Sequence, residues 1–231
     1  MTAGGHAIVV ADGDPPTKEA LDRAWPGWDA EVAVVIAADG GARTAERLGL
    51  RLDAVVGDLD SLGEEAAATL ERHGVSVIRS PAAKDETDTE LAIVEAARRG
   101  ARSVAIVGAL GGDRVDHGLA NVGLLGHPAL AGLGATIVDR RARLSLLTAS
   151  PDERPVERRL PGPNGGLISL IPFGGDAVGV TTAGLRYSLR DEDLPVSAPR
   201  GVSNVRVGPV ASVRLRRGRL LIVEVAATLD R

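Results

Sequence analysis

This chain of 231 residues has no cysteine, which excludes disulfide bonds, thiolate metal sites and a cysteine nucleophile. Aromatic residues are scarce as well, at 2% of the chain. Positive charge is carried almost entirely by arginine, since Lys18 and Lys84 are the two lysines among 27 basic residues. A retained lysine such as Lys84 can act as a compact point charge on a phosphate group. The net charge of −4 argues against a protein that binds nucleic acid non-specifically.

Long apolar runs and the common nucleotide-binding motifs are also missing. No apolar run reaches the ~18 residues of a transmembrane helix, and residues 1–10 lack the basic start of a signal peptide. We therefore expect a cytoplasmic protein that does not bind a membrane. Neither G-x-x-x-x-G-K-[ST] nor a G-x-G-x-x-G after a strand occurs. The four histidines are dispersed, so the sequence indicates neither a zinc-type cluster nor a Ser/His/Asp triad.

Short apolar runs alternate with helical patterns over the first 131 residues. We expect strands at residues 7–11, 32–38, 54–56, 75–78 and 104–107. We expect helices at residues 42–48, 64–73, 88–99 and 118–125. Thr87 with Glu90 forms a capping box at the start of the third helix, and Gly100 suits its end. Continuous apolar strands alternating with helices predict a mainly parallel sheet covered by helices on both faces, a three-layer α/β domain.

Aspartates follow the ends of several of these strands. Asp39 closes the second expected strand, Asp58 and Asp60 follow the third, and Asp88 opens the helix after the fourth. The carboxyl ends of parallel strands share one edge of the sheet, where ligands bind in such folds. Carboxylates crowded there would repel one another unless a divalent cation were present, and Mg²⁺ prefers oxygen ligands beside phosphates. An EF-hand is excluded, because position 12 counted from Asp58 is Thr69.

A glycine-rich segment, residues 108–118, follows the fifth expected strand. Its glycines permit a ligand to approach the backbone closely, and Arg114 can grip phosphate oxygens. A helix that starts near Asp116 would point free N–H groups in the same direction. His117 and Asn121 can equally serve as helix-capping or core hydrogen-bonding residues. This segment is a candidate phosphate-binding loop.

The pattern of apolar and polar residues changes after residue 131. Helical periodicity disappears, and short apolar runs alternate with Gly, Pro and Asp, with strands expected at 135–138, 144–147, 167–171, 178–182, 210–215 and 220–225. Such a pattern is typical of an antiparallel sandwich or barrel. Residues 150–166, rich in Pro and Gly, are expected to be a loop. We therefore expect two domains, an α/β domain over residues 1–131 and an all-β domain over residues 132–231.

An ordered set of short motifs in this chain resembles the thiamine pyrophosphokinase (thiamine diphosphokinase) family. In the first half these are Asp39-Gly40-Gly41, Gly57-Asp58-Leu59-Asp60-Ser61, Lys84-Asp85-Glu86-Thr87-Asp88, and Arg114-Val115-Asp116-His117 with Asn121. In the second half they are Thr181-Thr182-Ala183-Gly184-Leu185-Arg186-Tyr187 and Val202-Ser203-Asn204. One departure is the turn after the first strand, where Asp12 and Asp14 replace the family's usual Gly-rich sequence.

The resemblance implies a homodimer of two-domain subunits, an α/β catalytic domain followed by a β-sandwich, with thiamine held at the subunit interface. It implies transfer of a diphosphate from ATP to the hydroxyethyl group of thiamine, giving thiamine diphosphate and AMP. The implied Mg²⁺ ligands are Asp58, Asp60 and Asp88, with Asp39 nearby as a further catalytic residue. The implied ATP-binding residues are Lys84, Asp85, Arg114, Asp116, His117 and Asn121. The implied thiamine-binding residues are Tyr187, Ser203, Asn204 and Thr182.

The chemistry of the residues agrees with this reading. Diphosphate transfer needs charge neutralisation and alignment more than a covalent nucleophile. Tyr187 can stack on a flat cationic ring, although a tyrosine of a β-sheet core would look the same in sequence. Two alternatives stay open: a diphosphokinase for another heterocyclic alcohol, such as a pterin, and a non-catalytic nucleotide-binding regulatory module. A module of the second kind would have no need for four convergent carboxylates.

Overall fold

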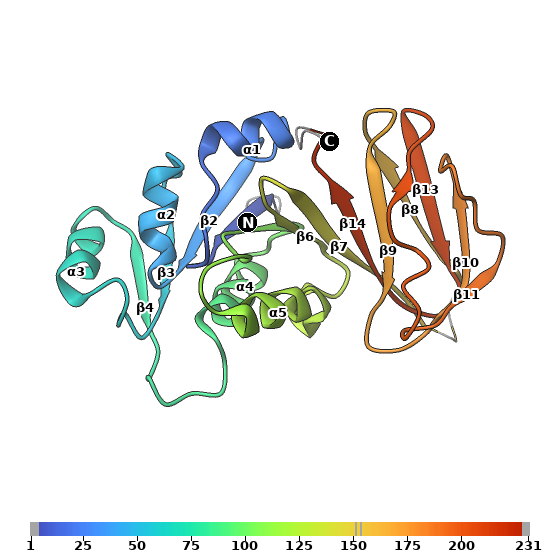
Figure 1. Ribbon diagram of the computed structural model, residues 1–231. Helices are drawn as coiled ribbons and strands as arrows, with labels where there is room; N and C mark the ends of the chain where they lie inside the picture. Colours follow the sequence, from blue (N-terminus) through green and yellow to red (C-terminus); the bar gives the residue numbers. More distant parts are fainter. Residues whose placement is uncertain (1–4, 151, 153, 228–231) are drawn as a thin grey trace. The chain divides into compact units, whose positions relative to one another are not determined.

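A computed structural model describes residues 5–150, 152 and 154–227, and the chain divides into two compact units, Met1–Arg140 and Arg141–Arg231 (Figure 1). The sequence places this boundary nine residues earlier, at 131/132. The difference arises because β6 (Gly134–Val138) pairs in parallel with β5 (Ser103–Val107). The strand expected to open the all-β half therefore completes the sheet of the first unit.

The first unit contains a parallel sheet whose strand order is β6-β5-β1-β2-β3-β4. Its remaining strands are β1 (His6–Val10), β2 (Val32–Ala38), β3 (Ala54–Gly57) and β4 (Ser76–Arg79). Every pairing within this unit is parallel. The five strands expected from the sequence are present with ends that differ by at most one residue. β1 lies between β5 and β2, so the strand order reverses beside it, which is where open α/β sheets bind ligands.

Helices cover both faces of this sheet, giving three layers (Figure 1). On one face, Ile8, Val35 and Val55 pack with Leu21, Ala45 and Ala67, which come from three helices. These are α1 (Lys18–Ala24), α2 (Gly41–Arg47) and α3 (Glu64–Arg72). The other helices are α4 (Asp88–Arg98), which packs against β1, β2 and β3, then α5 (Val115–Gly123), η1 (Leu124–Gly126) and η2 (Pro128–Leu130). None of the helices in the described residues is long and apolar enough to span a membrane.

Two local details refine the sequence reading of these helices. Thr87 caps α4 by accepting a hydrogen bond from the Glu90 amide at 3.2 Å, as expected. The Glu90 side chain, however, pairs with His127 Nε2 at 3.2 Å. Helix α1 was not predicted, because it is seven residues long and buries a single side chain, Leu21, so it produces no apolar periodicity.

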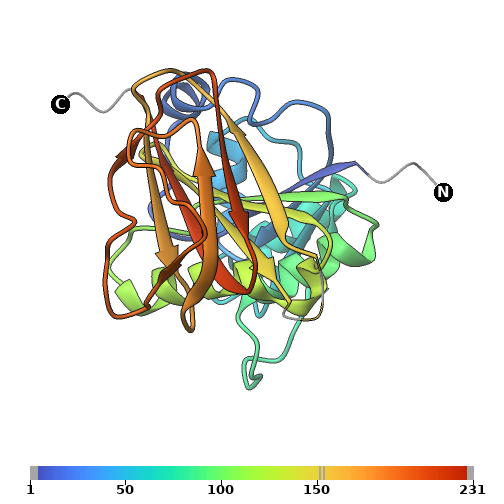
Figure 2. The same cartoon turned by 90° about the vertical axis from the view of Figure 1, so that its right-hand side faces the viewer.

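The second unit is an antiparallel sandwich of two sheets, with strand orders β12-β9-β14-β7 and β11-β10-β13-β8 (Figure 2). The strands are β7 (Ala142–Ala149), β8 (Val156–Pro161), β9 (Leu167–Pro172), β10 (Ala177–Ala183), β11 (Glu192–Leu194), β12 (Asn204–Val205), β13 (Val210–Leu215) and β14 (Gly218–Val225). Both sheets contribute to one core, with Ile168 and Ile222 from the first packed with Val180 and Val213 from the second.

Strand β8 lies inside the segment that was expected to be a loop, so that expectation is wrong for residues 156–161. β8 is at the end of its sheet and pairs with β13 alone, with Pro161 opposite Val210. An edge strand tolerates proline because one side of it needs no ladder hydrogen bond. The proline content of this segment therefore led to a loop being predicted where β8 forms. Pro151 and Glu153 of that segment lie outside the described residues.

Candidate active site

Asp39 sits in the turn between β2 and α2 and organises the neighbouring loop. Its side chain is 4% exposed, and its two carboxylate oxygens accept hydrogen bonds from the backbone amides of Ser61 and Leu62, each at 3.0 Å. The residue has φ +43°, a left-handed conformation that is uncommon outside glycine and is tolerated by Asp. Asp39 thus fixes the loop that follows β3 from the end of the adjacent strand.

That loop carries Asp58 and Asp60 on either side of a buried leucine. Leu59 is in the hydrophobic core with φ +66°, so the chain turns sharply at this residue. Anchoring Leu59 leaves the flanking carboxylates outside the core, and the Asp58 side chain accepts from the Asp60 amide at 3.2 Å. One carboxylate oxygen from each of Asp39, Asp58 and Asp60 lies within 4.8 Å of the others. We call these three residues the acidic cluster.

Asp88, at the first turn of α4, faces Lys84. Asp88 Oδ1 lies 2.8 Å from Lys84 Nζ, whereas Asp58 Oδ2 lies 3.9 Å from the same nitrogen. Lys84 Nζ also donates to Ser80 Oγ at 2.9 Å. Burial lowers the pKa of Lys84, but the ion pair with the Asp88 carboxylate and the other carboxylates nearby outweigh burial and hold this pKa above its ordinary value. Lys84 therefore remains charged beside the acidic cluster.

Two glycines in the predicted motifs make room for these side chains. A Cβ atom at Gly57 would lie 2.9 Å from Asp39 Cβ and 3.2 Å from Asp88 Cγ. A Cβ atom at Gly40 would collide with the Asp12 carboxylate. The Gly-Asp-x-Asp and Asp-Gly-Gly patterns thus contain glycine because carboxylates from neighbouring strands approach the backbone there.

Asp12 is a site residue to which the sequence reading assigned no role. It follows β1, lies against Gly40, and has its pKa raised by burial and by the nearby Asp39. Arg43 and Arg47 act on Asp12 in the opposite direction. The signal in the sequence was its position, since Asp12 ends a strand as Asp39 does. The adjacent loop bonds to the glycine-rich segment after β5, with Gly13 N donating to Gly108 O at 2.8 Å.

The predicted phosphate-binding residues at the start of α5 lie on the surface. Arg114 donates twice to Asp116, at 2.9 and 2.6 Å, and this pair holds the pKa of Asp116 at about 2. His117 and Asp85 are exposed, whereas Asn121 Nδ2 donates to the Ala109 carbonyl at 2.8 Å. Asn121 therefore holds the glycine-rich segment, and Arg114 is paired with Asp116 rather than with the acidic cluster.

In the second unit, Tyr187 is 65% exposed and borders a cavity of about 310 Å³. That volume is at the lower end of the range for small-molecule sites. The other residues around it are Leu170, Ser188, Leu189, Arg200, Gly201, Val202 and Asn204. Tyr187 is thus not a core tyrosine.

Two of the predicted thiamine-binding residues hold the loop that carries Tyr187. Asn204, 7% exposed, accepts from the Tyr187 amide at 3.0 Å and donates to the Tyr187 carbonyl at 2.7 Å. Thr182 is buried, and its Oγ1 accepts from the Leu189 amide at 2.9 Å. Ser203 adopts φ +61°, and its amide donates to Ser169 Oγ at 3.0 Å. Of these three residues, Asn204 alone lines the cavity.

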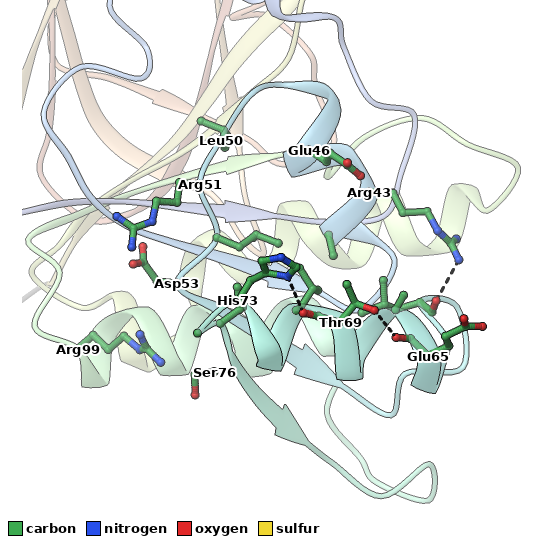
Figure 3. A pocket seen from close by; sticks show the side chains of 18 residues that line it. Arg43, Glu46, Leu50, Arg51, Asp53, Glu65, Thr69, His73, Ser76 and Arg99 are labelled. Atoms are coloured by element: carbon green, nitrogen blue, oxygen red, sulfur yellow. Dashed lines mark hydrogen bonds between the residues drawn. The ribbon is translucent and has the colours of Figure 1, made fainter.

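A second hollow, of about 1330 Å³, lies in the first unit among α2, α3 and the segments that precede β3 and β4 (Figure 3). Leu50, Leu52, Leu70 and Val75 contribute its apolar lining, and Figure 3 shows Arg43, Glu46 and His73 around it. No predicted site residue lines this hollow.

Comparison with known proteins places the chain in a family. The family model described as thiamin pyrophosphokinase, catalytic domain, matches residues 28–134. The model described as thiamin pyrophosphokinase, vitamin B1 binding domain, matches residues 156–220. The chain belongs to the thiamine pyrophosphokinase family. The two matches follow the order of the two units, so the acidic cluster falls in the segment that matches the first model and Tyr187 in the segment that matches the second.

Individual relatives agree with this membership. A thiamine pyrophosphokinase of Bacillus subtilis is 26% identical over 197 residues, which cover 85% of this chain and 89% of that protein. Thiamine pyrophosphokinase 1 of Oryza sativa is 26% identical over 166 residues, covering 69% of this chain and 61% of that protein.

Solved structures of the family share the fold. The thiamin pyrophosphokinase family protein from Enterococcus faecalis has a TM-score of 0.78 at 26% identity, covering 98% of this chain and all of that one. The Bacillus subtilis crystal structure has a TM-score of 0.80 at 23% identity, covering 96% of this chain and 99% of that one. The expected fold class, an α/β unit with a mainly parallel sheet followed by an antiparallel β unit, is confirmed.

Proposed function

We propose that this protein transfers a diphosphate group from ATP to the hydroxyethyl group of thiamine, giving thiamine diphosphate and AMP. The observation that carries the proposal is the convergence of Asp39, Asp58 and Asp60 at the carboxyl edge of the sheet, inside the part that matches the family's catalytic domain. In this reaction the thiamine oxygen bonds to the β-phosphorus of ATP, the bond from that phosphorus to the oxygen bridging the α-phosphate breaks, and AMP leaves. The hydroxyl proton passes to a base.

Mg²⁺ is the metal that these residues would hold. Carboxylate oxygens are the ligands it prefers, and Asp58, Asp60 and Asp88 are the proposed ligands. Asp39 contributes mainly by positioning, because each of its oxygens already accepts a backbone amide. When bound, the metal neutralises and aligns the phosphates. A carboxylate of the acidic cluster that does not bind the metal can accept the thiamine proton.

The other motif residues of the first unit are assigned to ATP. Lys84, already charged at the acidic cluster, supplies a mobile cation for the phosphates. Arg114 and Asp116 are exposed and available to a ligand, and so are His117, which follows Asp116, and Asp85, which follows Lys84. Asn121 supports the glycine-rich segment whose backbone would approach the phosphates.

The thiamine ring is assigned to the cavity beside Tyr187 in the second unit. An exposed tyrosine face attracts a flat cation such as thiazolium. Ser203 is not one of the lining residues but lies between two of them, Val202 and Asn204, in the chain; its hydroxyl can both donate and accept, which suits an aminopyrimidine edge. Asn204 and Thr182 act on the ring indirectly, through the loop that carries Tyr187.

We further propose a homodimer whose subunit interface completes the thiamine pocket. The support is the set of large apolar side chains left exposed on the second unit: Ile171, Val196, Val202, Val207 and Val210, together with Tyr187. Apolar side chains left exposed can be covered on association, and twofold dimers are the commonest oligomers. Light scattering at micromolar concentration should report about twice the chain mass, and a fully active monomer would exclude a shared pocket.

The experiment that tests the reaction is incubation with Mg²⁺, ATP and thiamine, followed by separation of nucleotides and thiamine esters. AMP and thiamine diphosphate should form in equal amounts. ADP as the nucleotide product would mean single phosphoryl transfer and would overturn the proposal. AMP formation with a pterin alcohol, but not with thiamine, would favour the alternative diphosphokinase, and no turnover with either would favour a regulatory module.

A further inference from the structure

The ammonium group of Lys84 occupies a place in the site that a metal ion would contest. Its Nζ lies 2.8 Å from Asp88 Oδ1 and 3.9 Å from Asp58 Oδ2, and it is hydrogen-bonded to Ser80. The Lys84 side chain is only 12% exposed. The Lys84 side chain is therefore held among carboxylates. It does not extend into solvent, as we would expect of a lysine that serves only to bind the phosphates of ATP.

Asp88 behaves differently from the other proposed metal ligands. In the described part of the chain, the carboxylate oxygens that converge within 4.8 Å come from Asp39, Asp58 and Asp60, and Asp88 does not join them. Asp88 Oδ1, a buried atom, faces Lys84 instead. If Mg²⁺ binds the Asp88 oxygen that faces Lys84, the metal and the ammonium group compete for that oxygen.

We propose that, in the metal-free site, the Lys84 ammonium group is the cation bound to Asp88. Binding of Mg²⁺ at Asp88 would displace this ammonium group, which then moves toward the phosphates of ATP. This inference rests on the proposed metal-dependent function. Two cations a few ångströms apart repel each other at a partly buried site, so each weakens the hold of the other on carboxylates that they share. The lysine stem has four flexible carbons, which lets its charge move without a backbone change.

The competition has a consequence that a fixed structural ion pair would lack. Without nucleotide, Lys84 should weaken Mg²⁺ binding, because both cations need Asp88. With ATP present, the released ammonium group gains phosphate oxygens, so the same residue should strengthen binding of the Mg²⁺–ATP complex. Removing the Lys84 charge should therefore strengthen Mg²⁺ binding without nucleotide and weaken binding of the Mg²⁺–ATP complex.

The first test uses the unaltered protein and its second lysine as an internal control. Lys18 is also ion-paired, with Asp22 at 3.1 Å and Asp29 at 2.8 Å, but it lies on α1. Trace acetylation with acetic anhydride, quantified by mass spectrometry, should label Lys84 about threefold faster or more in saturating Mg²⁺ than without it, since release exposes the amine. Labelling of Lys18 should not change. An unchanged Lys84 rate, when calorimetry shows Mg²⁺ bound, would overturn the proposal, whereas no bound Mg²⁺ at all would overturn the metal site itself.

The second test measures Mg²⁺ affinity by calorimetry without nucleotide. Lys84→Gln should bind Mg²⁺ about threefold more tightly or better, because a competing positive charge is gone. Lys84→Arg keeps the charge, so its Mg²⁺ affinity should stay closer to that of the unaltered protein. The Mg²⁺ affinity of Lys18→Gln should equal that of the unaltered protein. The Lys84→Gln protein should also show a raised KM for Mg²⁺–ATP. Equal or weaker Mg²⁺ binding by a folded Lys84→Gln protein would show that Lys84 is not a competitor.

Discussion

Replacing Asn204 by alanine should loosen the loop that carries Tyr187 and so weaken thiamine binding without touching the ring directly. The Asn204 side chain makes three hydrogen bonds, to the amide of Tyr187 at 3.0 Å, to its carbonyl at 2.7 Å and to the amide of Val205 at 2.9 Å. Alanine keeps none of them and leaves these partly buried groups without their partners.

The magnitude follows from the number of bonds lost. A typical intramolecular hydrogen bond contributes about 0.5–1.5 kcal/mol net, so three of them contribute about 1.5–4.5 kcal/mol to the stability of the second unit. Part of this loss should appear as disorder of the Tyr187 loop, which thiamine would then have to order on binding. The KM for thiamine should rise several-fold, while the KM for ATP should change little.

The chain offers a convenient reporter, because Tyr187 is its single tyrosine. Incorporation of 3-fluorotyrosine gives one ¹⁹F resonance, which should broaden or shift in Asn204→Ala before any thiamine is added. Trp25 and Trp28 lie in the first unit, so their fluorescence follows that unit separately. Asn164→Ala, which changes an exposed asparagine of the same unit, is the matched control and should behave as the unaltered protein.

An Asn204→Ala protein whose ¹⁹F resonance and stability are unchanged would refute the role of Asn204 in holding the Tyr187 loop. This role would also be refuted if the KM values for thiamine and ATP rose together while the loop stayed ordered. Asn204→Asp provides an intermediate case, because it keeps an oxygen for the Tyr187 amide but places that carboxylate opposite the Tyr187 carbonyl. Its KM for thiamine should be raised as well.

Three further predictions follow from the site. Asp58→Asn or Asp60→Asn should abolish Mg²⁺-dependent activity and leave the melting temperature unchanged or slightly higher, since like charges repel in the metal-free cluster; full turnover at ordinary Mg²⁺ would remove these residues from the metal site. Tyr187→Ala should raise the KM for thiamine several-fold at constant melting temperature, because an aromatic face contributes ~0.5–2 kcal/mol to binding a cation, and an equal rise in the KM for ATP would contradict the division of roles. Asp12→Asn should raise the melting temperature at pH 7. Burial raises the folded-state pKa of Asp12 above its ordinary 3.8, so the penalty for ionising it is present at neutral pH, and the gain should vanish in melts below that value.

Much of the local structure of this protein is encoded in short stretches of sequence. The apolar runs that form β1, β2, β3 and β5 are continuous because the inner strands of a covered parallel sheet are buried on both faces, whereas β4 lies at the sheet edge and is partly exposed. Thr87 caps α4 because its hydroxyl reaches the Glu90 amide within one turn. The position of Asp58 and Asp60 after β3 follows from the same pattern. Because these strands run parallel, their carboxyl ends, and the residues that follow them, lie at the same edge of the sheet.

Other features depend on contacts between distant segments, which no local pattern encodes. Strand β8 forms in a Pro-rich stretch because β13 pairs with it at a sheet edge, and β6 joins the first unit because β5 lies beside it. Asp12 and Asp39 are 27 positions apart and become neighbours only because β1 and β2 are paired.

The roles of individual side chains were decided in the same way. The sequence by itself determined that carboxylates gather at the ends of the strands and that a tyrosine lies in the second half. Only the tertiary structure decided that the Asp39 carboxylate accepts hydrogen bonds from the amides of Ser61 and Leu62, and that Asn204 holds the backbone of Tyr187. It also decided that Lys84 lies on Asp88. The physical reason is that a sequence specifies which polar groups exist, whereas partners for buried polar groups are chosen by what the folded chain brings within hydrogen-bonding distance.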